Sequence, residues 1–244
     1  MLTNSEVKSY AHLRRLRILD HIWKDYLQDM ILHIIYTEKP NMVFRGGTCI
    51  WKLYNGDRFS EDVDLCVETI PEGLEEHITK ELVFLGFIPV IERRKRTANM
   101  LFTRFTISSP AHPQPTTIII EILESQECAK KGSPATIYSP YPDIPPIDVL
   151  ASNLDILAAD KVSAIFGRDK PRDIHDLYIL LKQGAKMDIE TIAKQIPGFT
   201  IESFKQRMEE KSREWKKLEP LLVSRLPPLK EEVSFITRCF EKQT

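Results

Sequence analysis

The sequence is poor in cysteine and has no cysteine cluster. Its four cysteines, Cys49, Cys66, Cys128 and Cys239, are scattered, and none belongs to a CxxC pair. A disulfide framework and a cysteine-ligated zinc site both depend on clustered cysteines. We therefore expect reduced cysteines, as in a cytoplasmic protein, and neither a disulfide framework nor a zinc site.

Long uncharged runs and an excess of one charge are also missing. No apolar stretch is long enough to cross a bilayer, and the N-terminus lacks the basic-then-apolar pattern of a signal peptide, so we expect no membrane contact. The 34 lysines and arginines nearly balance the 35 aspartates and glutamates. That balance excludes an overall basic surface for nucleic acid but leaves room for a local basic patch.

The hydrophobic pattern divides the chain into a mixed half and a helical half. Apolar residues at helical spacing predict one long helix or two abutting ones over residues 5–36. Apolar or β-branched runs predict strands at 42–44, 63–67, 87–92, 100–107 and 117–123. Helical periodicity predicts further helices at 48–54, 72–85, 153–166, 172–182, 189–196, 201–222 and from 229 onward.

A segment with five prolines, residues 125–146, is predicted as a loop between the two halves. The fold class that follows is α+β, with a mixed sheet flanked by helices and then a helical C-terminal region. The expected domains are residues 1–146 and 147–244, and 244 residues suffice for two such cores.

Two aspartates one residue apart, Asp62 and Asp64, begin an apolar strand. Side chains at this spacing point to the same face of a strand. Two carboxylates so close repel each other unless they are solvated, partly protonated or holding cations, and hard cations such as Mg²⁺ accept such oxygen ligands. A third acid, Glu121, stands inside an otherwise apolar strand, where an unpaired carboxylate is unfavourable. We favour it as a ligand of the same metal site over the alternative, an acid on an exposed strand face. Ser60 has the same parity as the pair and is a candidate phosphate contact or carboxylate partner.

A glycine turn, Gly46-Gly47-Thr48, precedes the acid pair. Glycines let the backbone approach a ligand closely, and a helix that Thr48 would N-cap offers its positive end to a phosphate. Lys52 follows one helical turn later on the same face. Such a turn alone is more typical of a plain connection to a helix; the nearby acid pair reverses that preference and favours phosphate binding.

Charged residues in the C-terminal half allow two interpretations. Lys161 interrupts an apolar helical stripe, so it either extends to solvent or reaches a triphosphate, and Arg168 would align with it on a continuing helix. Asp173 and Asp176 begin the next helix, where the helix dipole alone explains acids.

The basic run at residues 93–96 is predicted as a solvated hairpin tip or, alternatively, as a contact to an RNA backbone.

Together these residues resemble the four motifs of the AbiEii/AbiGii toxin family, which are nucleotidyltransferases of the DNA polymerase β-like superfamily. The motifs are Arg45-Gly46-Gly47-Thr48 with Lys52, the block from Arg58 to Leu65, Lys161 with Arg168, and Arg172-Asp173 with Asp176-Leu177. Their order and spacing are characteristic over residues 44–181. Cys49 departs from the pattern, because a small residue such as alanine is common there.

The resemblance implies a nucleotidyltransferase core that the helical C-terminal domain completes, with Mg²⁺ as cofactor and a nucleoside triphosphate as donor. Family members are toxins of type IV toxin–antitoxin or phage-abortive systems, and some modify tRNA ends. The implied function is therefore transfer of NMP to RNA, expected to be tRNA, by a toxin with a cognate antitoxin. Transfer to a protein or small molecule, or a non-catalytic nucleotide-binding module, are the alternatives.

The resemblance also assigns roles to individual residues. Gly47, Thr48 and Lys52 would bind the triphosphate, and Asp62 and Asp64 the metals. Lys161 and Arg168 would steady the phosphates, and Asp173 or Asp176 would act as base or organiser.

Overall fold

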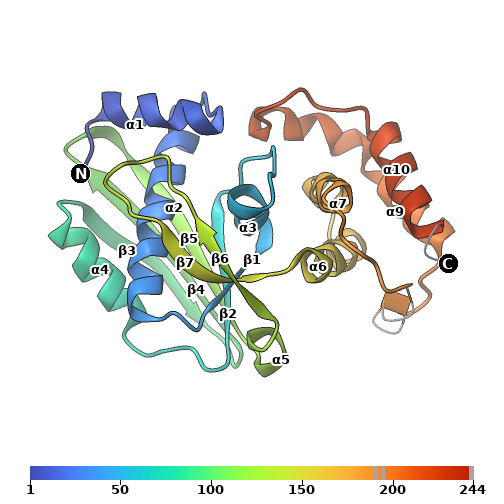
Figure 1. The fold of residues 1–244 in the computed structure, drawn as a ribbon, viewed down its shortest axis with the longest axis horizontal. Helices are drawn as coiled ribbons and strands as arrows, with labels where there is room; N and C mark the ends of the chain where they lie inside the picture. Colours follow the sequence, from blue (N-terminus) through green and yellow to red (C-terminus); the bar gives the residue numbers. More distant parts are fainter. Residues whose placement is uncertain (190–191, 194–195, 242–244) are drawn as a thin grey trace. The chain divides into compact units, whose positions relative to one another are not determined.

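The computed structural model describes residues 1–189, 192–193 and 196–241, and the chain forms two compact units (Figure 1). The sheet unit consists of residues 1–49 and 60–152, and the helical unit consists of residues 50–59 and 153–244. The chain passes from one unit to the other between Ser152 and Asn153, a little beyond the domain boundary expected at residue 146. Residues 50–59 belong to the helical unit although they lie early in the sequence.

In the described part of the chain, seven strands form one mixed sheet in the order β3-β4-β5-β2-β1-β7-β6. β2 runs parallel to β5 and β1 runs parallel to β7, while the other neighbouring strands are antiparallel. The strands are β1 (Val43–Arg45), β2 (Asp62–Val67), β3 (Ile88–Arg96), β4 (Met100–Ser109), β5 (His112–Glu124), β6 (Gly132–Ile137) and β7 (Ile147–Ser152). The mixed sheet with flanking helices confirms the predicted α+β class.

One face of the sheet is covered by helices. Thr103 of β4 donates a hydrogen bond to Glu75 of α4 (Leu74–Phe84), so the face that carries Thr103 meets α4. Helix α2 (Leu19–Glu38) contacts α4 and lies against β5 and β7. On β5 this face carries three buried isoleucines, Ile118, Ile120 and Ile122.

The opposite face of the sheet carries Asp62, Asp64 and Glu121, and we call it the acid face. Successive residues of a strand alternate between the two faces, and directly paired residues share a face. The buried valine and leucine between and after the aspartates, Val63 and Leu65, therefore point into the core beneath the helices. This alternation places both aspartates on one side, as the sequence predicted.

The N-terminal helical segment is two helices rather than one. Helix α1 (Asn4–Ala11) starts at a capping box formed by Thr3 and Glu6, and a short 3₁₀ turn, η1 (His12–Arg14), follows it. Arg15 then takes a left-handed conformation with φ of 58°, which ends the first helix before α2 begins. Of the two predicted arrangements, the abutting helices are therefore correct.

The basic run lies inside strand β3, and the predicted hairpin tip at residues 93–96 is wrong. The sequence pattern misled because β3 is an edge strand whose residues are mostly exposed, so it lacks apolar alternation. Charged side chains are typical of edge strands, where they prevent pairing with other chains.

The proline-containing segment 125–146 is not an unbroken loop, so that prediction is also wrong. It contains the short helix α5 (Gln126–Ala129) and strand β6, which is the other edge of the sheet. Pro134 sits in β6 because an edge strand tolerates a residue without an N–H group.

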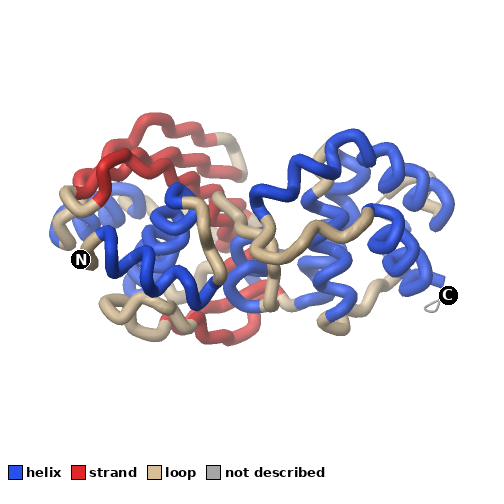
Figure 2. Tube along the Cα trace, turned by 90° about the horizontal axis from the view of Figure 1, so that it is seen from above, coloured by secondary structure: helices blue, strands red, loops and turns tan. Residues whose placement is uncertain are grey.

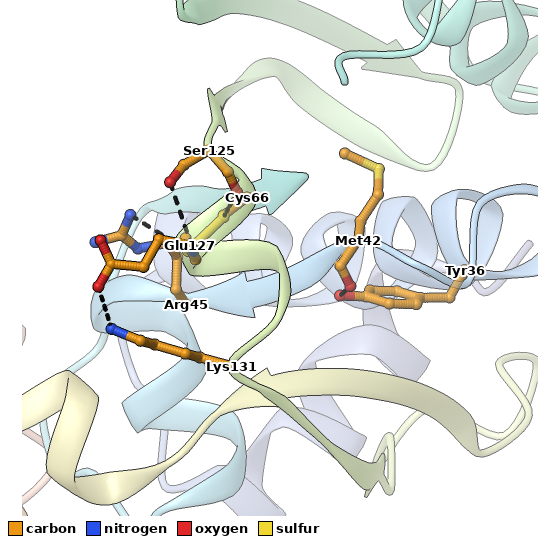
Figure 3. The surroundings of a disulfide bond; sticks show 8 residues. Tyr36, Met42, Arg45, Cys66, Ser125, Glu127 and Lys131 are labelled. Atoms are coloured by element: carbon orange, nitrogen blue, oxygen red, sulfur yellow. Dashed lines mark hydrogen bonds and ion pairs between the residues drawn. A yellow bond between two sulfur atoms is a disulfide. The ribbon is translucent and has the colours of Figure 1, made fainter. Parts of the chain in front are cut away.

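Two of the four cysteines form a disulfide, which corrects the expectation that all are reduced. Cys66 of β2 and Cys128 of α5 are joined with their Cα atoms 6.3 Å apart, and Arg45 of β1 lies beside Cys128 (Figure 3). The cysteines are 62 residues apart in the sequence, and only the pairing of β2 with β5 brings them together. Cys49 and Cys239 are not disulfide-bonded.

The helical unit consists of helices joined by loops (Figure 2). Helix α6 packs against α7 and α9, and α10 packs against α7 and α9. The elements are α6 (Leu154–Gly167), α7 (Arg172–Lys182), α9 (Ile201–Glu209), the 3₁₀ segment η2 (Glu210–Leu221) and α10 (Leu229–Glu241). Of the predicted helix at 189–196, residues 190, 191, 194 and 195 lie outside the described residues. Among the described residues, no helix has both the length and the apolar character needed to cross a membrane.

Residues 57–59 are held in the helical unit by backbone hydrogen bonds. The N–H of Phe59 donates to the carbonyl of Leu221 at 2.8 Å, and the N–H of Val223 donates to the carbonyl of Asp57 at 2.9 Å. Helix α3 (Gly46–Leu53) begins in the sheet unit and ends in the helical unit, so the chain changes unit within this helix.

Candidate active site

The acidic residues of the sheet unit are brought together by the parallel pairing of β2 with β5. Asp64 pairs directly with Glu121, and Asp62 pairs with Ile119 on the same face. Neighbouring strands are roughly 4.8 Å apart, so Asp64 and Glu121 are side-by-side carboxylates. All three acids are partly exposed.

The glycine turn lies directly against one of these carboxylates. Arg45 of β1 pairs with Asp64, and Gly46 follows it with a left-handed φ of +72° as the first residue of α3. A Cβ atom on Gly46 would overlap the carboxylate of Asp64. Only glycine satisfies both demands, because it has no Cβ and adopts positive φ without strain.

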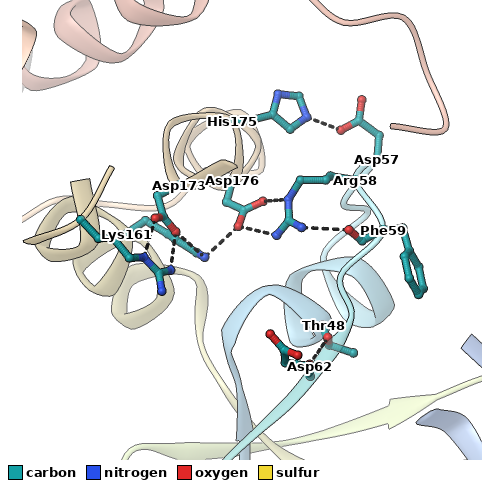
Figure 4. Close-up of polar contacts among 10 residues, drawn as sticks. Thr48, Asp57, Arg58, Phe59, Asp62, Lys161, Asp173, His175 and Asp176 are labelled. Atoms are coloured by element: carbon teal, nitrogen blue, oxygen red, sulfur yellow. Dashed lines mark hydrogen bonds and ion pairs between the residues drawn. The ribbon is translucent and has the colours of Figure 1, made fainter. Parts of the chain in front are cut away.

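Thr48 does not cap helix α3, and that prediction is wrong. The helix already begins at Gly46, and the fully buried Thr48 hydroxyl donates a hydrogen bond to the backbone carbonyl of Asp62 (Figure 4). The side chain therefore ties the glycine turn to the strand that carries the two aspartates. Gly47 lies between Gly46 and Thr48, in the first turn of the helix.

Ser60 and Lys52 occupy different surroundings. Ser60 is buried just before β2, and its backbone carbonyl accepts a hydrogen bond from Gln28 of α2 at 2.8 Å. Gln28 also donates to the carbonyl of Glu61, so it fixes the chain on its way into the acid strand. Lys52 lies in the half of α3 that belongs to the helical unit and is half-buried.

The donor chemistry of the acid face suits magnesium. Mg²⁺ is usually bound by one or two carboxylates, completed by water and substrate phosphate oxygens, rather than by an all-protein cage. Among the described residues, no three His, Cys, Asp or Glu side chains are placed closely enough to hold a metal by themselves. Asp62, Asp64 and Glu121 therefore do not form a metal site by themselves, and a Mg²⁺ ion bound here would need water or substrate oxygens among its ligands.

The remaining predicted site residues form a network of charged side chains in the helical unit (Figure 4). Lys161 of α6 contacts Asp173 at 3.1 Å and Asp176 at 2.7 Å, both on α7. Arg168 donates two hydrogen bonds to Asp173, each at 2.8 Å. Arg58 donates one hydrogen bond to each carboxylate oxygen of Asp176, at 2.9 and 2.8 Å.

The cations of this network keep both aspartates ionised. Burial works to raise the pKa of Asp176, but the charges of Arg58 and Lys161 outweigh it and hold that pKa well below its usual range. Burial likewise opposes ionisation of Asp173, whose pKa is nevertheless lowered by the hydrogen bond from Arg168 and the charge of Lys161. A general base works best with a pKa near the operating pH. Asp173 and Asp176 are thus ionised partners of these cations, and whether either acts as base or as organiser stays a prediction.

The sequence matches the family described as nucleotidyl transferase AbiEii toxin of type IV toxin–antitoxin systems, over residues 32–235. The chain belongs to the AbiEii family. The motif resemblance is thereby confirmed, and the protein is a nucleotidyltransferase. Membership in a type IV toxin–antitoxin family implies a cognate antitoxin.

Solved structures share the fold of this AbiEii protein. JHP933 from Helicobacter pylori matches with a TM-score of 0.57 and 19% identity, covering 89% of each chain. A candidate nucleotidyltransferase from H. pylori matches with a TM-score of 0.57 and 18% identity, covering 89% of this chain and 92% of the other. No curated protein sequence matches the chain.

Two charged groups of the AbiEii protein escaped the sequence analysis. His175 lies between Asp57 and Glu232 at 2.7 Å from each. Burial opposes its charge, but hydrogen bonds to the two acids raise the pKa of His175 to about 9. Arg58 appeared only as part of a motif, without a partner. Their partners are 57 to 118 residues away, so no local spacing reveals them.

Proposed function

We propose that this AbiEii protein transfers NMP from a nucleoside triphosphate to RNA, expected to be tRNA, in a reaction that depends on Mg²⁺. The observation that carries the proposal is the contact of the Gly46 turn with Asp64, which is itself paired with Glu121. A backbone suited to phosphate thus adjoins carboxylates suited to a divalent cation.

The triphosphate is assigned to the start of helix α3. Gly46 and Gly47 leave their N–H groups unshielded by side chains, and the N-terminus of a helix carries partial positive charge. Thr48 holds this turn in place through the carbonyl of Asp62. Lys52 on the same helix is the proposed cation for the phosphate charge.

Asp62, Asp64 and Glu121 are the residues that would hold magnesium. A bound Mg²⁺ supplies charge neutralisation and lowers the pKa of an acceptor hydroxyl. The acceptor oxygen forms a bond to the α-phosphorus while the bond to the departing pyrophosphate breaks, and the hydroxyl proton passes to water. Phosphoryl-type transfers of this kind need positioning and electrostatic stabilisation more than covalent help from the protein. Within the helical unit, the proposed role of Asp173 and Asp176 is to fix the side chains of Lys161 and Arg168.

The proposal is tested by incubating total RNA with each labelled nucleoside triphosphate, with and without Mg²⁺. The wild-type protein is expected to label RNA only with Mg²⁺, and Asp64→Asn is expected to label nothing. Label found on protein or on a small molecule would show that this molecule, and not RNA, is the acceptor. Nucleotide binding without any transfer would support the non-catalytic alternative and contradict the proposal.

A further inference from the structure

The four basic residues of strand β3 are divided between the two faces of the sheet. Arg93, Arg94, Lys95 and Arg96 follow one another, and alternate residues of a strand point in opposite directions. Arg94 pairs with Thr103, which faces helix α4, whereas Arg93 pairs with Arg104 on the acid face. The run therefore presents two cations to each side.

The two cations on the helix-covered side form ion pairs with acids of the sheet unit. Arg94 forms an ion pair with the buried Glu75 at 2.9 Å, and Arg96 forms one with Glu124 at 3.7 Å. These contacts explain Arg94 and Arg96 as residues that hold the edge strand to the rest of the sheet unit.

The cations on the acid face have no such partners. Arg93 and Lys95 are exposed, Arg104 is half-buried, and among the described residues none of the three forms an ion pair with an acid. Arg93 instead lies over the ring of Phe102, 5.9 Å from its centre. The Nε atom of Arg104 is buried without a hydrogen-bond partner. A buried donor left unsatisfied is unfavourable, and a phosphate oxygen would accept a hydrogen bond from it.

These cations lie in the same rows of the sheet as the acids. Arg104 pairs with Ile119, which pairs with Asp62, and Arg93 pairs with Arg104. Lys95 pairs with Phe102, which pairs with Glu121, the neighbour of Asp64. With a strand spacing of roughly 4.8 Å, β4 lies about 10 Å and β3 about 14 Å from the strand of the aspartates.

We propose that Arg93, Lys95 and Arg104 form a cationic strip that binds the phosphate backbone of the RNA whose end is modified. The inference rests on the proposed RNA acceptor and adds the surface that would hold it. Backbone phosphates leading away from a hydroxyl at the acids would pass over this strip. Proteins that bind single-stranded nucleic acid commonly combine cationic side chains with an aromatic ring, because the cations bind the phosphates and the bases stack on the ring.

The test compares two double variants that remove the same charge from opposite faces. Binding of an unstructured RNA oligonucleotide is measured over a range of salt concentrations for the wild type, for Arg93→Gln with Lys95→Gln, and for Arg94→Gln with Arg96→Gln. Each lost phosphate contact lowers the salt slope of binding by about 0.7 for a single strand. The acid-face variant is therefore expected to show a slope shallower by about 1.4 and the covered-face variant an unchanged slope. Adding Arg104→Gln to the acid-face variant is expected to make the salt slope shallower still.

Several outcomes would overturn the inference. An unchanged slope in the acid-face variant would do so, as would an equal fall in both variants, which would reflect net charge alone. If removing Arg94 from Glu75 prevents folding, Arg96→Gln alone serves as the control for Lys95→Gln. Polyglutamate that displaces the RNA at equal charge concentration would indicate an acidic protein partner and overturn the RNA assignment.

The labelling assay separates failure of this inference from failure of the proposed function. If the wild type labels RNA and the acid-face variant labels it with the same KM for RNA, the cationic strip alone is overturned. Absence of RNA labelling by the wild type, with the salt slopes as expected, overturns the acceptor reaction and supports the strip as an RNA-binding surface.

Discussion

Asp64 and Glu121 are direct neighbours across the parallel strands β2 and β5, with the carboxylate of Asp64 also against Gly46. Like charges directly opposite each other on a sheet are destabilising. A cation bound between the two carboxylates would offset their repulsion and so stabilise the folded protein. The same pair thus links the stability of the protein to the proposed cofactor.

We expect Mg²⁺ to raise the melting temperature of the wild type but not that of Asp64→Asn or Glu121→Gln. At about 100 times its Kd, a ligand that binds only the folded state stabilises it by about 2.7 kcal/mol, or roughly 5–10 °C for a domain of this size. Thermal unfolding with and without the ion provides the measurement. Glu124→Gln is the matched control, because Glu124 follows on the same strand and pairs with Arg96. An equal shift in Glu121→Gln and the wild type would remove Glu121 from the site.

Gly46→Ala is expected to abolish nucleotide transfer, whereas Gly73→Ala is expected to leave it intact. Both glycines have a φ near +73°, so both substitutions introduce similar backbone strain, on the order of 1 kcal/mol. Only at Gly46 would the new Cβ overlap the Asp64 carboxylate, since Gly73 has no neighbouring atom within 4 Å. Transfer rates measured below the melting temperature of both variants separate strain from displacement. Equal activity of the two variants would show that the position of Asp64 is unimportant.

Local pattern was sufficient to predict the strands that carry the acids. The alternation around Asp62 and Asp64 determines their common face, because side chains in a strand repeat every second residue. The pairing of Asp64 with Glu121 was a hypothesis about which strands are neighbours, and the register of β2 with β5 places them together. Whether both residues hold a metal stays a prediction.

The features that sequence reasoning missed depend on contacts between distant segments or on sheet edges. Charges in β3 and Pro134 in β6 look like loop signals, yet both strands are edges, where apolar alternation and a complete set of N–H donors are not required. The disulfide between Cys66 and Cys128 and the partners of His175 follow from tertiary packing alone. The acid-face position of Arg104 likewise emerges only from the register of β4.

Asp176→Asn is expected to destabilise the protein strongly. Arg58 and Asp176 are almost entirely buried, and removing one partner of a buried ion pair costs about 3–5 kcal/mol. Arg168→Gln should cost less than about 1 kcal/mol, because the Arg168 side chain is 47% exposed and Asp173 keeps Lys161. Urea unfolding of both variants measures the difference. An Asp176→Asn protein of unchanged stability that has lost transfer would instead identify Asp176 as a catalytic base.

The free energy of unfolding is expected to fall as the pH rises from 6.5 to above 9. His175 has an ordinary pKa of 6.5, and its position between Asp57 and Glu232 raises that pKa to about 9 in the folded protein. A group whose pKa is higher when folded stabilises the protein fully below the unfolded value, and this contribution is lost as the pH passes the folded value. For this shift the contribution is on the order of 3 kcal/mol at most. The measurement is urea unfolding at pH 6.5, 7.5, 8.5 and 9.5. Asp57→Asn is expected to show a smaller decline of the free energy of unfolding with pH, because one of the two acids beside the imidazole is then neutral. Parallel curves for the two proteins would show that Asp57 does not hold the charge on His175.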